Sequence, residues 1–115
     1  MKNEFPEYLK NYLTPDRIDV VDYLPSSHGQ IWPRCIFVGG KGSLEEQIKT
    51  ILHEVTHLHP NFISYTGGLW QGFLDRNEEI ENQITKHAEK IYKTKKDIVD
   101  LIKTNLKKAK KYSEN

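Results

Sequence analysis

The chain has 115 residues, enough for one domain that buries about two thirds of its unfolded surface. No apolar run approaches the roughly 20 residues of a membrane-spanning helix, and the first residues lack the apolar core of a signal peptide. The single cysteine excludes an intrachain disulfide and favours a reducing, cytoplasmic setting. The net charge is +1, but residues 1–85 are acidic, whereas residues 86–115 hold ten lysines against four acidic residues.

The first third of the chain predicts a short helix and two strand regions. Apolar residues recur at helical spacing within residues 3–13, and Pro15 interrupts the pattern. Residues 18–23 alternate as a strand does, and a turn at 25–29 leads to a second strand region at 31–38. Pro33 lies inside this region and either splits it or confines it to the edge of a sheet.

The next segment predicts an amphipathic helix with a metal-binding pattern. A capping box at residues 43–46 starts the helix, and Pro60 ends it. Its apolar residues cluster on one side: Leu44, Ile48, Ile51, Leu52 and Val55. His53 and His57 lie one turn apart and opposite that stripe, where they can share one Zn²⁺ ion. Glu54 completes a His-Glu-x-x-His motif and can take a proton from a zinc-bound water.

A second helix, from Asp75 onward, offers the third zinc ligand. Its apolar stripe is Ile80, Ile84, Ala88 and Ile91. On a helical wheel Glu78 lies about 160° from Ile80 and Glu81 about 100° from it, at the edge of the stripe. We therefore expect Glu78 to bind the metal, with Glu81 as the second choice. Asn82 is one turn beyond Glu78 and can orient a ligand histidine through its second ring nitrogen.

The remaining segments add candidates with weaker arguments. Residues 59–74 join the two helices and must therefore pass near the site. Tyr65 is a candidate to stabilise the oxyanion, and Trp70 is a candidate to line a substrate pocket. For most of the aromatic residues in this segment, however, packing in the core is the simpler explanation. His59 is an alternative ligand, and His87 a second candidate to stabilise the oxyanion. The helical period continues to residue 106 as one long helix or two stacked ones, with its lysines on a solvated face.

The motif and the following Asn77-Glu78-Glu79-Ile80-Glu81-Asn82 resemble the gluzincin pattern of thermolysin-type peptidases. The short length is most similar to the minigluzincins, the selecase-like minimal soluble metallopeptidases. This resemblance covers roughly residues 31–92 and implies that Glu78 binds zinc, with Asn82 in place of the family's Asp. It also implies that residues 106–115 can act as an inhibitory tail in a latent form. Peptidases of the phage-immunity group have a comparable arrangement.

Taken together, the sequence predicts a single α+β domain over residues 1–115. We expect a small, mostly antiparallel sheet, an N-terminal helix, an active-site helix, a glutamate helix and a C-terminal helix. The expected function is a zinc metalloendopeptidase with one Zn²⁺ per chain, a peptide or protein substrate that adds to an edge strand at residues 34–38, and no membrane partner. A homo-oligomer is compatible with the sequence. The alternative is a non-catalytic protein that binds a partner or nucleic acid through its basic C-terminal helix.

Overall fold

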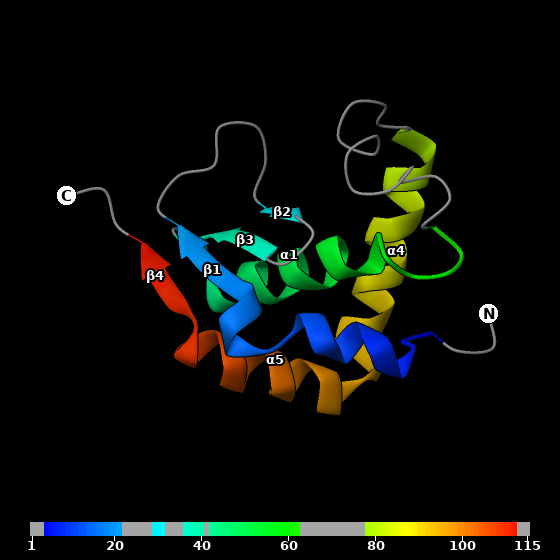
Figure 1. Cartoon of the computed structure of the whole chain (residues 1–115). Coiled ribbons are helices and arrows are strands. Elements are labelled where there is room, and N and C mark those ends of the chain that lie inside the picture. Colours follow the sequence, from blue (N-terminus) through cyan, green and yellow to red (C-terminus); the bar gives the residue numbers. More distant parts are fainter. Residues whose placement is uncertain (1–3, 22–28, 32–35, 41, 63–77, 113–115) are drawn as a thin grey trace.

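The computed structural model describes residues 4–21, 29–31, 36–40, 42–62 and 78–112, and the predicted α+β class is confirmed there (Figure 1). The elements in chain order are η1 (Glu7–Tyr12), η2 (Pro15–Arg17), β1 (Ile18–Val21), β2 (Gly29–Ile31), β3 (Ile36–Gly39), α1 (Leu44–Thr56), α4 (Glu78–Thr94), α5 (Lys96–Lys108) and β4 (Lys110–Tyr112). Among the described residues, no helix is both long enough and apolar enough to cross a membrane.

The four described strands form one mixed sheet in the order β2-β3-β1-β4. The pairs β1–β3 and β1–β4 are parallel, and only β2–β3 is antiparallel. The expectation of a mostly antiparallel sheet is therefore wrong. The physical reason is that no tight hairpin connects β1 to either of its neighbours. The chain forms β2, at the edge of the sheet, before it returns as β3. The helices α1, α4 and α5 lie between β1 and β4 in the chain. The edge strands are β2 and β4. Residues 34–38 were expected at an edge, but residues 36–38 lie in the interior strand β3, and residues 34 and 35 lie outside the described part.

Helix α1 is the centre of the fold and contacts β2, β3, α4, α5 and η1. It begins where expected, because the Ser43 Oγ accepts a hydrogen bond from the Glu46 backbone N–H at 3.1 Å. The inward face consists of Ile48, Ile51, Leu52, Val55 and Thr56, all buried. Leu44, expected in this stripe, is instead 45% exposed in the first turn. Each large aliphatic side chain that is fully buried stabilises the fold by about 1.5–3 kcal/mol, so this face anchors the motif helix firmly.

The N-terminal segment packs beneath α1 (Figure 1). The short helix expected within residues 3–13 is present as the 3₁₀ helix η1 over Glu7–Tyr12. Three hydrogen bonds connect the segment to distant parts of the chain. His87 Nε2 donates to the Glu4 carbonyl at 2.6 Å, and the Tyr8 hydroxyl donates to the Leu58 carbonyl at 2.6 Å. Asn105 Nδ2 donates to the carbonyl of Leu13 at 2.7 Å. These contacts attach the segment to α4, to the end of α1 and to α5.

The continuous helical period after residue 78 is divided into two helices. The break is at Lys95, whose φ of −113° and ψ of 72° are not helical, although the sequence has neither proline nor glycine there. Figure 1 shows that α5 turns away from α4 and runs along the lower side of the molecule. This turn brings the apolar side of α5 into the same core as α1: Ile98, Val99, Ile102 and Leu106. The lysines of α5 are exposed, as expected of a solvated face.

The chain after α5 returns to the sheet. Residues 110–112 form β4, which pairs with β1 at the edge of the sheet away from β2. The segment 106–115 was expected to be a candidate inhibitory tail. In this structure residues 106–108 belong to α5 and residues 110–112 to β4, while residues 113–115 lie outside the described part.

Candidate metal centre

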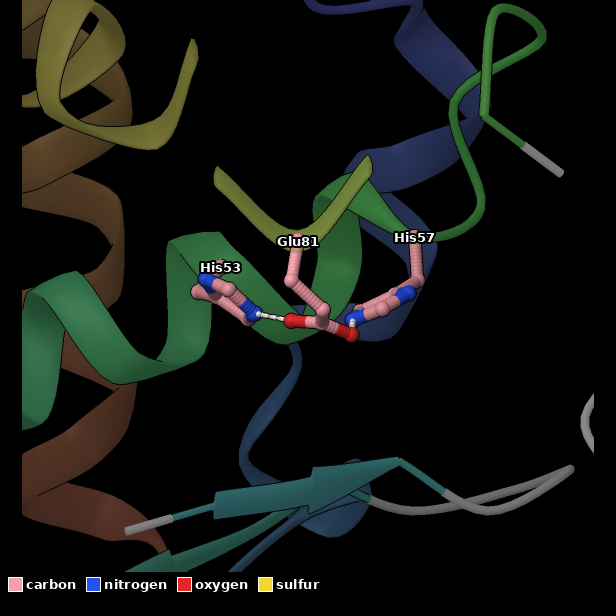
Figure 2. Close-up of side chains that lie close together, drawn as sticks. All are labelled: His53, His57 and Glu81. Atoms are coloured by element: carbon pink, nitrogen blue, oxygen red, sulfur yellow. Dashed lines mark hydrogen bonds and ion pairs between the residues drawn. The ribbon is translucent and has the colours of Figure 1, made fainter. Parts of the chain in front are cut away.

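His53 and His57 present their rings from the last turn of α1 toward the start of α4 (Figure 2). Their ring centroids are 5.2 Å apart. His57 is the C-cap residue of α1, but its φ of −54° and ψ of −27° remain helical. The i, i+4 geometry therefore continues to the end of the motif, and both side chains are half-buried because α4 crosses this outer face of α1.

Glu81, in the first turn of α4, places its carboxylate between the two rings. His53 Nε2 lies 2.8 Å from Glu81 Oε2, and His57 Nε2 lies 3.2 Å from Glu81 Oε1. Because an ionised carboxylate only accepts hydrogen bonds, both Nε2 atoms carry the proton in this arrangement. The hydrogen bonds to His53 and His57 hold the pKa of Glu81 well below its usual range, although burial alone would raise it. The carboxylate is consequently ionised at neutral pH.

These three side chains could hold a metal ion. Their ligand atoms all lie within 4.8 Å of one another. A tetrahedral ion with bonds of about 2.1 Å separates its ligand atoms by roughly 3.4 Å. The carboxylate would therefore need to move about 0.6 Å away from His53 Nε2 and about 0.2 Å away from His57 Nε2. Two imidazoles and one carboxylate are a donor set found at catalytic zinc, where a fourth position stays open. One Zn²⁺ is compatible with this group.

Thr85 was not predicted as part of the site and lies one turn after Glu81 on α4. Its Oγ1 is 3.1 Å from His53 Nδ1. A hydroxyl both donates and accepts, so Thr85 can donate to Nδ1 when the proton is on Nε2, and can accept from Nδ1–H when Nε2 binds a metal. It therefore fits the role of orienting a ligand histidine. The sequence could have indicated Thr85, because it lies four residues after Glu81. The same spacing from Glu78 was the reason for considering Asn82.

The other predicted residues are placed differently. Glu78 and Asn82 are both exposed on α4, and the group of possible ligands contains Glu81 in place of Glu78. Glu54 is half-buried on α1, beside His53 in the sequence. Tyr65 and Trp70 lie outside the described residues.

His59 and His87 lie together in a separate, buried cluster. Their ring centroids are 5.2 Å apart, and the ring of Phe62 is 5.8 Å from His59 and 6.0 Å from His87. His59 Nδ1 accepts a hydrogen bond from the Asn61 backbone N–H at 3.0 Å. Burial lowers the pKa of His87, although its hydrogen bond to the Glu4 carbonyl opposes this shift. Neither histidine belongs to the group formed by His53, His57 and Glu81.

Comparisons with family models, with curated proteins and with solved structures found no match to this chain.

Proposed function

We propose that the chain is a zinc-dependent metalloendopeptidase of the gluzincin type, with His53, His57 and Glu81 holding one Zn²⁺. The observation that supports this proposal most strongly is the carboxylate of Glu81 between two Nε2 atoms four residues apart. A His-Glu-x-x-His sequence can occur by chance in a helix. A carboxylate from another helix within hydrogen-bond distance of both rings is much less expected by chance. The minigluzincin resemblance of the motif is in accord with this chemistry, with the ligand shifted from Glu78 to Glu81.

Zinc, when bound, supplies a Lewis acid that polarises the scissile carbonyl and lowers the pKa of water to about 7. The chain supplies the proton transfer. Glu54 follows His53 on α1, and on the helical wheel its direction lies about 60° from that of His57, on the flank of the ligand group. A half-buried carboxylate at this position can accept a proton from the attacking water and then deliver it to the leaving amine. Bond cleavage therefore requires Glu54, whereas metal retention does not.

The sheet offers a route for the substrate. Strand β2 is at the edge of the sheet, and it contacts α1, which carries the two histidines. An extended peptide can bind such an edge by main-chain hydrogen bonds, as an added strand. We therefore assign the substrate rim to β2 rather than to residues 34–38, and expect a peptide bound there to run along α1.

The test separates metal binding from catalysis. Zinc content is measured in the wild type and in the variants Glu81→Ala, Glu78→Ala and His57→Ala. We expect about one zinc per chain in the wild type and in Glu78→Ala, and a clear loss in the other two. Glu78 is the matched control, because it is a carboxylate on the same turn of the same helix. Loss of zinc in Glu78→Ala alone would refute the ligand assignment.

Catalysis is tested with Glu54→Gln on an unstructured protein substrate. This variant should keep its zinc and lose activity by a factor on the order of 10²–10⁴, the usual contribution of a general base. The assay is run at several protein concentrations, because self-inhibition between molecules weakens on dilution. Full activity of Glu54→Gln would refute the mechanism. A wild type that binds no zinc when zinc is supplied would refute the proposed function and favour the non-catalytic interaction protein.

A further inference from the structure

A second candidate site lies in the N-terminal segment. The residues of η1, the turn after it and η2 surround an open depression of about 420 Å³, lined by Tyr8, Asn11, Tyr12, Thr14, Asp16 and Arg17. This volume lies within the range of pockets for small ligands. None of its lining residues belongs to the candidate metal centre, so a ligand bound here would not contact that centre.

Arg17 supplies the charge in this depression. Its guanidinium lies over the ring of Tyr12, 5.3 Å from the ring centroid, and the side chain is half-buried. The ion pairs found among the described residues do not include Arg17. A cation–π contact does not occupy the N–H donors of a guanidinium, so these groups can still donate to an acceptor. A partly desolvated guanidinium of this kind is well suited to a bidentate carboxylate.

Tyr8 forms an aromatic wall of fixed position. Its hydroxyl donates to the carbonyl of Leu58, while the side chain remains 44% exposed. Burial raises the pKa of Tyr8, so the hydroxyl stays protonated and the hydrogen bond to Leu58 persists at neutral pH. An exposed ring that is held in place loses little entropy when an apolar group packs against it, and it therefore favours a ligand with an apolar side chain.

The polar rim limits the charge of the ligand. Asp16 stands beside Arg17 and is exposed, so the two formal charges in the depression cancel. Asp16 repels a phosphate with about two negative charges more strongly than a carboxylate with one, and one carboxylate matches the fork of a single guanidinium. Asn11 and Thr14 add an amide and a hydroxyl that can pair with a peptide group.

We propose that this depression binds the C-terminal carboxylate of a peptide. The Arg17 guanidinium donates two parallel hydrogen bonds to the carboxylate, and the ring of Tyr8 packs against the last side chain. The open shape suits the end of a longer chain, because the rest of the peptide can extend into solvent. The residues that would contact the peptide lie within residues 8–17, and none of them is a candidate zinc ligand, so the proposal does not depend on zinc binding.

The test uses the full chain without added metal and two acetylated pentapeptides that end in leucine. One has a free carboxylate and the other a carboxamide. Binding is followed by amide chemical shifts in NMR spectra, which also locate the site. We expect the free acid to shift residues 8–17 and the carboxamide to bind at least about tenfold more weakly. This comparison needs no variant, so a folding defect cannot imitate it.

Variants test the role of Arg17. Arg17→Gln should weaken binding of the free acid by about tenfold or more, and Arg17→Lys should not restore it, because lysine lacks the planar fork. Lys10→Gln is the matched control: it removes one positive charge from η1 at a residue that pairs with Glu7 and does not line the depression. Equal binding of the two peptides, or an equal loss in Lys10→Gln, would overturn the proposal. So would equal affinity for acetate and the peptide, because acetate has only the carboxylate.

Discussion

The interaction of Thr85 with His53 gives a prediction that is specific to this structure. Thr85→Val keeps the shape and the β-branched side chain but removes the hydroxyl 3.1 Å from His53 Nδ1. Partners that orient a ligand histidine typically contribute 10–100-fold to metal affinity. Thr85 is exposed, so water can replace part of its hydrogen bond, and we expect the lower end of this range. The predicted loss is about tenfold in zinc affinity, or about 1.4 kcal/mol.

Competition between the protein and a chromophoric chelator measures this loss directly. Thr94→Val is the matched control, because Thr94 is also an exposed threonine on α4 and its hydroxyl donates only to the Lys90 carbonyl at 2.7 Å. Thr85→Ser retains a hydroxyl and should recover most of the affinity. If Thr85→Val binds zinc as tightly as Thr94→Val, Thr85 does not orient the ligand and the contact with His53 is incidental.

Two further predictions concern stability. Burial lowers the pKa of His87 from its ordinary value of 6.5. As the pH falls through that value, the unfolded chain therefore binds more protons at His87 than the folded chain does, and the free energy of unfolding decreases. The melting temperature of the wild type should therefore drop more between about pH 7.5 and about pH 5.5 than that of His87→Gln, and parallel curves would contradict this assignment. Ser43→Ala removes the N-cap of α1 and should cost about 1 kcal/mol, a fall of about 4 °C in Tm by calorimetry, whereas Ser43→Asp should retain the wild-type value.

The sequence was most informative about α1. Its cap, its buried stripe beyond the first turn and the outward direction of His53 and His57 all follow from local spacing, and the structure has them. The helical period determines these features because they depend on one helix and its own neighbours. The position of the break at Lys95 could not be predicted in the same way. Ile91 and Ile98 are seven residues apart and would share a face in an unbroken helix as well.

The choice between Glu78 and Glu81 depended on how two helices cross. A wheel centred on Ile80 favoured the residue that points farthest from the apolar stripe. In the structure Ile80 is only half-buried, and the buried side of α4 is formed by Ile84, His87, Ala88 and Ile91. A side chain that reaches across to another helix comes from the flank of the buried side, and Glu81 lies on that flank. The strand directions were equally hidden, because alternation identifies a strand but not its partners.

The contacts of the N-terminal segment have a consequence for how the chain is made. Residues 4–13 are synthesised before α4 and α5, yet their partners include His87 on α4 and Asn105 on α5, and β1 pairs with β4 at residues 110–112. Contacts of such large sequence separation close long loops and slow the folding of a domain. Residues 4–21 therefore cannot complete their packing until residues 105–112 are present. A nascent chain that stops before residue 105 has neither the Asn105 partner of Leu13 nor the β4 partner of β1, so we expect this domain to complete its packing only after residues 105–112 have been made.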